Sequence, residues 1–136
     1  KVYDNNREGQ LKLVGYAITE KLQVFPKYKA AIISLSAEEL SRFGYVKGDT
    51  EGLVNQALSV EGVNFAAFAH ESDDRVKISF RSVGKFSVRD FSANHFGGGG
   101  HHNAAGGSST NTLDEVVQKI ISLLPEYSAD LDYIAP

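Results

Sequence analysis

Short apolar runs and one clear alternation predict the strands of this chain. Residues 10–18 and 28–35 have the length and composition of strands, and the second is apolar enough to be buried. Residues 63–69 form a nearly continuous apolar run, which is typical of a strand covered on both faces. Residues 72–74 are turn formers. After them, apolar positions alternate with polar ones: Val76, Ile78 and Phe80 against Lys77, Ser79 and Arg81. The last two strands therefore predict a hairpin.

Capping residues and apolar stripes predict four helices. Capping boxes at 36–39 and 112–115 start the first and the last of them. Another helix is expected to open at 49–52, where capping explains Asp49, and a short one follows over 87–96. The last three have apolar residues along one side, so they are expected to lie against a sheet.

This order of elements predicts an α/β fold: a single layered domain with a mixed β-sheet flanked by helices. A Gly-rich loop, residues 97–107, is expected between the last two helices. We expect one domain over residues 1–125 and an acidic C-terminal tail over 126–136. The tail is either disordered or packed back through three apolar residues, Leu131, Tyr133 and Ile134.

Composition narrows the classes of function. The chain has 136 residues, enough for one domain, and no apolar run of the ~20 residues that a membrane span needs. It contains no cysteine, which fits a reducing cytoplasm. It begins with Lys1 and contains no methionine, so we expect a segment of a longer polypeptide. The net charge of −3 argues against extended duplex binding and leaves room for a small anionic ligand held by a few cations.

The most informative segment is 96–107, Phe-Gly-Gly-Gly-Gly-His-His-Asn-Ala-Ala-Gly-Gly. Four consecutive glycines cost much conformational entropy to order, so a folded domain keeps them for a reason. Their N–H groups can approach a phosphate closely, and the imidazole of His101 can donate to it as well. A flexible linker is the alternative, although the flanking Phe96 and Asn103 are not typical of linkers.

Other candidate residues allow two interpretations each. Arg81 ends the alternating strand, where it is either a surface charge or an anion ligand. A zinc site of His95, His101 and His102 is a further alternative, but it lacks the usual spacing and a fourth ligand. His70 closes an apolar strand and is most simply an ordinary edge histidine.

Three blocks resemble the DHH-associated domain, first type, of DHH-family phosphoesterases. Residues 96–106 resemble its Gly-Gly-Gly-His-x-x-Ala-Ala-Gly signature, and 77–82 resemble its Lys-Val-Ser-x-Arg-Ser segment. Residues 48–55 are similar to a segment of its branch of bifunctional oligoribonucleases and 3′-phosphoadenosine 5′-phosphate phosphatases. The blocks occur in the order found in the family.

The resemblance implies that an N-terminal DHH lobe of the same polypeptide holds two manganese ions, while this domain grips the substrate. The ligand would be a short oligonucleotide or a nucleotide phosphate. The residues that would contact it are Arg81, Ser82, Gly98, Gly99, Gly100, His101 and Asn103. No Asp-His-His motif occurs in this chain, so no catalytic or metal-binding residue is assigned and the isolated chain is expected to be inactive.

We therefore predict the substrate-recognition lobe of a bacterial-type, cytoplasmic, manganese-dependent phosphoesterase. Its substrates would be short oligoribonucleotides or 3′-phosphoadenosine 5′-phosphate. The alternatives are an exopolyphosphatase-related lobe, an RNA-binding accessory domain like that of alanyl-tRNA synthetase, and a structural or dimerising domain. The resemblance to the oligoribonuclease segment and the negative net charge favour the first interpretation over the RNA-binding one.

Overall fold

Six segments of the described chain, residues 7–134, form one sheet. The strands of this computed structural model are β1 (Gln23–Phe25), β2 (Ala30–Leu35), β3 (Phe65–Ser72), β4 (Arg75–Ser82), β5 (Gly99–His101) and β6 (Ala104–Ser109). Their order across the sheet is β1-β2-β3-β4-β6-β5. β2 and β3 run parallel, and the other neighbours are antiparallel. The sheet is therefore mixed, as predicted, and the β3–β4 hairpin is confirmed.

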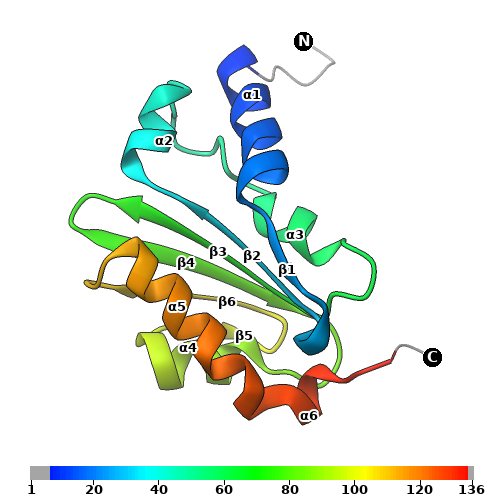
Figure 1. Cartoon of the computed structure of the whole chain (residues 1–136). Helices are drawn as coiled ribbons and strands as arrows, with labels where there is room; N and C mark the ends of the chain where they lie inside the picture. Colours follow the sequence, from blue (N-terminus) through cyan, green and yellow to red (C-terminus); the bar gives the residue numbers. More distant parts are fainter. Residues whose placement is uncertain (1–6, 135–136) are drawn as a thin grey trace.

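Helices cover both faces of this sheet. They are α1 (Glu8–Tyr16), α2 (Ala37–Arg42), α3 (Leu53–Leu58), α4 (Val88–Phe96), α5 (Leu113–Leu123) and α6 (Ser128–Leu131). A π-helical turn (Ala17–Lys21) continues α1, and 3-10 turns precede β2 (Pro26–Tyr28) and α6 (Leu124–Tyr127). Figure 1 shows α1, α2 and α3 on one face and α4 and α5 on the other. The fold is the predicted α/β single domain.

Two apolar cores lie on the two faces. One is built from β2, β3 and β4 with α4 and α5, and its centre is a cluster of aromatic rings from Phe65, Phe80, Phe86 and Phe91. The other lies between β2 and β3 and the helices α1 to α3, and includes Leu13. Because β2 and β3 contribute to both cores, their apolar runs are buried on both faces, as the sequence predicts.

The local helix signals are confirmed. The Ser36 hydroxyl accepts a hydrogen bond from the Glu39 amide (3.1 Å), and the Glu39 carboxylate accepts one from the Ser36 amide (2.9 Å). Thr112 and Glu115 make the same reciprocal pair at the start of α5. Each box satisfies two backbone N–H groups that a helix start would otherwise leave unpaired.

The strand predicted over 10–18 is wrong, because these residues lie in α1 and the π-helical turn that follows it. Leu11 and Leu13 alternate with polar residues, which suggests a strand. The buried pair is instead Leu13 and Ala17, four residues apart, while Leu11 is exposed. The spacing of four, rather than the alternation, identifies the buried face.

The Gly-rich loop predicted over 97–107 is also wrong, because most of it forms the β5–β6 hairpin. These strands consist of Gly, Ala, Ser and His, which have no apolar alternation to report a strand. Their pairing with β4 provides the order that their own composition does not.

Asp49 does not cap α3 as predicted. The residue before α3 is Gly52, and it makes no side-chain cap. The buried Asp49 carboxylate instead accepts hydrogen bonds from the Val46 amide (2.8 Å) and from Arg7. It therefore fixes the segment between α2 and α3 to the start of α1.

The start of the predicted tail packs back onto the domain. Leu131 is buried, and the Asn64 side-chain amide donates hydrogen bonds to the carbonyl oxygens of Leu131 (2.8 Å) and Tyr133 (2.7 Å). Ile134 is exposed. Among the described residues, no helix has the length and apolar character needed to cross a membrane.

Candidate functional site

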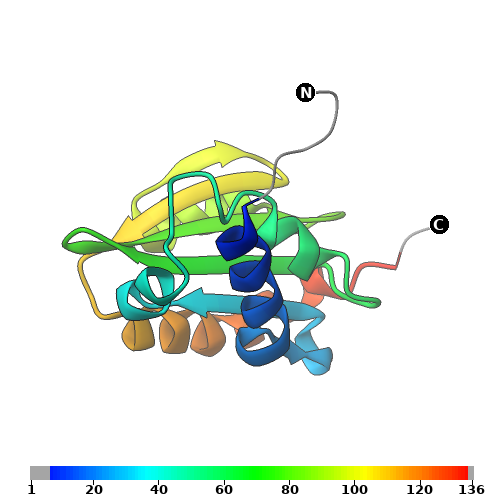
Figure 2. The same cartoon turned by 90° about the horizontal axis from the view of Figure 1, so that it is seen from above.

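One face of the sheet is only half covered. The core under α1 to α3 includes residues of β2 and β3 but none of β4, β6 or β5. In Figure 2, the yellow strands β5 and β6 extend beyond these three helices. The strand register shows which residues of β4, β5 and β6 face this uncovered side. They are Lys77, Ser79, Arg81, Gly99, His101, Ala104, Gly106 and Ser108. We call these eight residues the open face.

A cavity of about 370 Å³ lies where the open face meets α3. Its lining comes from the segment before α3, from α3 itself and from two strands: Thr50, Glu51, Gly52, Val54, Asn55, Phe68, His70, Ser79 and Arg81. We call it the Arg81 pocket. Two of the sequence blocks that resemble the DHH-associated domain, 48–55 and 77–82, therefore meet at one place. Its volume falls in the range of small-molecule sites.

Arg81 contributes its positively charged guanidinium to the lining of this pocket. The residue is half-buried, and its Nη1 donates one hydrogen bond to the Phe80 carbonyl oxygen (2.8 Å). Within residues 7–134, no carboxylate lies within ion-pair distance of the guanidinium. The remaining N–H groups are therefore free to bind an anion, and a guanidinium can bind two phosphate oxygens at once.

His101 lies in register with Arg81, two strands away. Arg81 pairs with Ala104 across β4 and β6, and Ala104 pairs with His101 across β6 and β5. Neighbouring strands are about 4.8 Å apart, so these two backbones are roughly 10 Å apart. Only the methyl group of Ala104 stands between them. A ligand lying on the sheet can thus contact both the guanidinium and the exposed imidazole.

The glycines of the hairpin are not equivalent. A Cβ atom at Gly98 would overlap the Gly106 carbonyl oxygen, and one at Gly100 (φ +145°) would lie 2.7 Å from the Ala104 oxygen. These two glycines allow close contact within the fold. A Cβ at Gly99 would meet no atom within 4 Å. Among residues 7–134, Gly99 therefore has no neighbour that requires a glycine for steric reasons, and it lies on the open face.

Ser82 and Asn103 bond to each other at the end of β4, where the Ser82 side chain points to the face opposite Arg81. The buried Ser82 hydroxyl accepts a hydrogen bond from the Asn103 side-chain amide (2.8 Å) and donates one to the Phe86 carbonyl oxygen (2.7 Å). These bonds hold the hairpin turn against the segment between β4 and α4. Substrate contact by Ser82, Asn103 and the other predicted site residues stays a prediction.

The histidines of the zinc alternative lie apart. His95 is on α4, on the other face, where its Nε2 lies 2.6 Å from the Tyr127 hydroxyl. Burial and the nearby Lys119 lower its pKa, against the influence of Glu126. The Nε2 of His102 lies 2.9 Å from the Gly84 carbonyl oxygen. Over residues 7–134, no three His, Asp or Glu side chains form a group that could hold a metal ion.

His70 is not an edge histidine, which corrects the prediction. It lies in β3, between β2 and β4, and its ring stacks on that of Phe68 (centroids 5.2 Å apart, 17° between planes). Burial lowers its pKa, and Lys77 acts in the same direction while a backbone hydrogen bond at Glu71 opposes it. The sequence signal for His70 is its place as a polar residue at the end of an otherwise apolar run. Its exposure to the Arg81 pocket depends on strand pairing, which this signal does not report.

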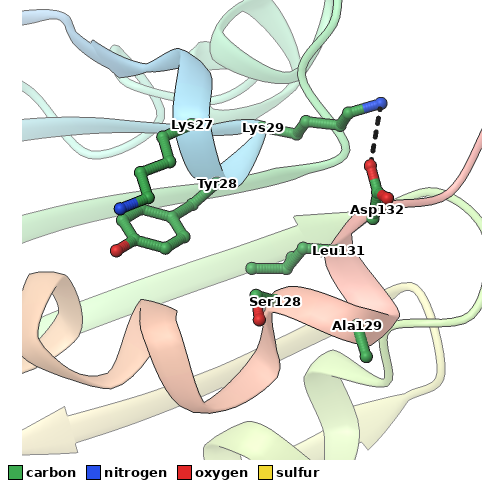
Figure 3. Close-up of a pocket in the computed structure, with 7 residues that line it drawn as sticks. All are labelled: Lys27, Tyr28, Lys29, Ser128, Ala129, Leu131 and Asp132. Atoms are coloured by element: carbon green, nitrogen blue, oxygen red, sulfur yellow. Dashed lines mark ion pairs between the residues drawn. The ribbon is translucent and has the colours of Figure 1, made fainter.

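A larger cavity, of about 570 Å³, lies away from these residues (Figure 3). It is lined by Lys27, Tyr28, Lys29, Ser128, Ala129, Leu131 and Asp132. In Figure 3 the Lys29 ammonium points toward the Asp132 carboxylate, with which it forms an ion pair (3.6 Å). It includes no residue predicted to contact substrate, and one of its two cations is paired, so we place the site at the open face.

Comparison with known proteins identifies the family of this chain. Residues 27–129 match the family model of the DHHA1 domain, and the chain belongs to this family. The predicted DHH-associated domain is thereby confirmed. No curated protein matches the chain.

Two solved structures resemble the chain over most of its length. A crystal structure of an exopolyphosphatase-related protein from Bacteroides fragilis is 42% identical, with a TM-score of 0.91 over 97% of this chain and 38% of that one. A pGpG-specific phosphodiesterase from Vibrio cholerae has a TM-score of 0.63 over 91% of this chain and 40% of that one. The second is 14% identical and shows the fold alone. This chain therefore spans about two fifths of either protein.

Proposed function

We propose that this chain is the substrate-recognition domain of a manganese-dependent DHH phosphoesterase that hydrolyses short oligoribonucleotides or 3′-phosphoadenosine 5′-phosphate. The observation that carries the proposal is the position of Arg81. It is a cation without a carboxylate partner in residues 7–134, at the edge of a pocket and in register with His101. Such a group in a half-buried position is suited to a phosphate.

In this proposal the chain binds and orients the substrate. Arg81 donates charge-assisted hydrogen bonds to a phosphate that does not react, and His101 donates another from β5. The absence of a side chain at Gly99 lets the ligand approach the backbone. Holding the substrate in one position lowers the entropic barrier to its reaction. The described residues do not fit a metal site, so manganese would be held by an N-terminal DHH lobe, and no catalytic step is assigned to these residues.

A second candidate is the recognition lobe of an exopolyphosphatase-related phosphohydrolase. The 42% identity to the Bacteroides fragilis protein favours it. The open face also has a second cation, Lys77, on the same side of β4 as Arg81. The RNA-binding alternative is less favoured, because the chain carries a net charge of −3.

Both candidates are tested on the full-length gene product that contains this chain. With manganese, we expect it to hydrolyse a dinucleotide or 3′-phosphoadenosine 5′-phosphate faster than polyphosphate, whereas the 136-residue chain alone should show no activity. Arg81→Ala should lower kcat/KM roughly ten- to a hundredfold, the effect of one charged hydrogen bond. Unchanged kinetics in this variant would contradict the proposal, and a clear preference for polyphosphate would select the second candidate.

The adjacent histidines provide a matched control. His101→Ala removes a side chain from the open face, and His102→Ala removes the same side chain from the turn. We expect a raised KM for the first and nearly normal kinetics for the second. Equal effects of the two substitutions would remove His101 from the proposed site.

A further inference from the structure

A fully buried hydroxyl group lies behind the glycine hairpin. It belongs to Ser92 of α4, the helix that packs against β5 and β6 from the face opposite the open face. The other buried residues of this helix, Val88, Phe91 and Phe96, are apolar. A hydroxyl buried in such surroundings costs free energy unless it is hydrogen-bonded, so its partner indicates its role.

The partner of Ser92 belongs to the open face. The Ser92 hydroxyl donates a hydrogen bond to the Gly106 carbonyl oxygen on β6 (2.6 Å). Gly106 pairs with Gly99 across β6 and β5, and both residues lie on the open face. This pair of glycines is the part of the open face that carries no side chains. Ser92 therefore holds that part of the surface from the opposite side of the sheet.

Ser92 also holds the start of the hairpin. Its carbonyl oxygen accepts a hydrogen bond from the Gly98 amide (3.1 Å). A Cβ atom at Gly98 would lie 2.5 Å from the Ser92 hydroxyl oxygen, and one at Gly107 would lie 2.8 Å from it. Glycine at these two positions therefore lets α4 approach the hairpin closely. One residue of α4 thus contacts the hairpin before β5 and along β6.

The residue next to Ser92 contacts the strand that carries Arg81. The ring of Phe91 packs against that of Phe80 on β4, with centroids 5.4 Å apart. Phe80 directly precedes Arg81 and points to the opposite face of the strand. Neighbouring residues of one helix therefore fix two parts of the open face, β4 through Phe91 and β6 through Ser92. The distance between the cation and the glycine pair depends on both contacts.

We propose that Ser92 is a positioning residue of the substrate site. Its hydroxyl keeps the pair of Gly99 and Gly106 at a fixed position relative to Arg81, so that a ligand bound to Arg81 can lie on the two glycines. The inference rests on the proposed function, because it takes the open face as the binding surface. It gives α4, which lies on the other face of the sheet, an effect on ligand affinity.

The test is an NMR titration of the 136-residue chain and its variants with AMP. Ser92→Ala removes the hydrogen bond to Gly106 and should weaken AMP binding roughly three- to tenfold, the range of one net hydrogen bond. Ser92→Cys keeps the size of the side chain and a weak donor, so its affinity should lie between the two. In Ser92→Ala, amide exchange in β5 and β6 should accelerate about tenfold relative to β2.

A variant of similar stability separates positioning from general destabilisation. Ile33→Val makes a small cavity in the core on the other face, away from the hairpin. We expect Ile33→Val and Ser92→Ala each to lower the melting temperature by about 2–6 °C. Only Ser92→Ala should weaken AMP binding. In the full-length gene product, Ser92→Ala should raise KM with kcat nearly unchanged, and Ile33→Val should change neither.

The outcomes distinguish the role of Ser92 from the function on which it rests. If Ser92→Ala binds AMP as tightly as Ile33→Val does while Arg81→Ala still weakens binding, the role of Ser92 is overturned and the proposed function stands. If Ser92→Ala does not fold, Ser92→Cys decides, and wild-type affinity and exchange in that variant would overturn the role. If AMP does not bind, or Arg81→Ala has no effect on binding, both inferences fail.

Discussion

The two halves of the sheet differ in what covers them. β2 and β3 are buried on both faces and consist largely of Ala, Ile and Phe. β4, β6 and β5 are covered mainly by α4 on one face, and their other face, where only β4 contacts α3, is the open face. There the strands present Gly, Ala and Ser around two basic side chains and a histidine. β2 and β3 therefore contribute to the stability of the fold. β4, β6 and β5 provide a surface of small side chains that a ligand can reach, beside the Arg81 cation.

This difference gives the two faces of β4 different roles. In β4, Phe80 is fully buried among aromatic rings, while the next residue, Arg81, points to the opposite face. The rigid core on one side therefore fixes the position of the charge on the other. A site on a central strand is held more precisely than one on a loop.

The largest expected effect is a difference in stability between variants of the neighbouring residues Phe80 and Arg81. Phe80→Ala should lower the free energy of unfolding by about 3–5 kcal/mol, because it removes a large side chain from a packed core. Arg81→Ala should change it by less than about 0.5 kcal/mol, since the side chain makes one hydrogen bond to its own strand. Urea unfolding measures both values. Similar losses in the two variants would contradict the division of β4 into a structural and a functional face.

The next largest effect on stability is expected for a substitution at one of two neighbouring glycines of the β5–β6 hairpin, Gly98 and Gly99. Gly98→Ala should cost about 1–3 kcal/mol, because the new methyl group overlaps the Gly106 carbonyl oxygen and forces the backbone apart. Gly99→Ala should leave stability unchanged and weaken nucleotide binding, because its methyl group enters the open face. The melting temperatures and a nucleotide titration of both variants check this. Wild-type binding by Gly99→Ala would indicate that no ligand approaches that glycine.

A smaller effect concerns the helices over the covered half. The Glu39 carboxylate accepts hydrogen bonds from Tyr16 of α1 and from the Ser36 amide, and pairs with Lys21 (3.2 Å). Burial raises the pKa of Glu39, but these partners together outweigh it and the net pKa lies below the ordinary glutamate value. A lowered folded-state pKa stabilises the fold above the unfolded pKa, and this contribution is lost as the pH falls through the folded value.

Glu39→Gln should therefore lower the free energy of unfolding by about 1 kcal/mol at pH 7. The difference from wild type should shrink below about pH 4.5, the ordinary value for this side chain. Glu38→Gln is the matched control, because Glu38 is exposed and, within residues 7–134, pairs only with Arg42 one turn later. Denaturant unfolding across this pH range is the measurement. A difference that grows toward acid pH would reverse the sign of the argument.

Signals within a few residues were sufficient for part of this fold. The two capping boxes, the alternation of β4 and the turn before it predict their elements because the interactions involved are local. The prediction over 10–18 failed because Leu11 and Leu13 imitate a strand while tertiary contacts bury Leu13 and Ala17. The strands of the glycine hairpin depend on β4, which no local pattern reports.

The sequence indicates candidate site residues one by one, but not their arrangement. The glycine signature and Arg81 are visible in the sequence, and family resemblance connects them. That Arg81, His101 and the segment before α3 surround one surface depends on the strand order, in which β6 inserts between β4 and β5. The exposure of His70 to the same pocket depends on β3 lying beside β4. Long-range pairing decides both.

The central claim is that a nucleotide phosphate binds the open face and not the opposite face of the sheet, which α4 and α5 cover. Amide shift mapping of the 136-residue chain with AMP tests it most directly, at an affinity on the order of millimolar because only one lobe is present. The account predicts shifts concentrated at residues 79–81, 98–101 and 104–106, and their loss in Arg81→Ala. Shifts concentrated on α4 and α5 or around Lys27 and Lys29, or spread evenly over the surface, would contradict it.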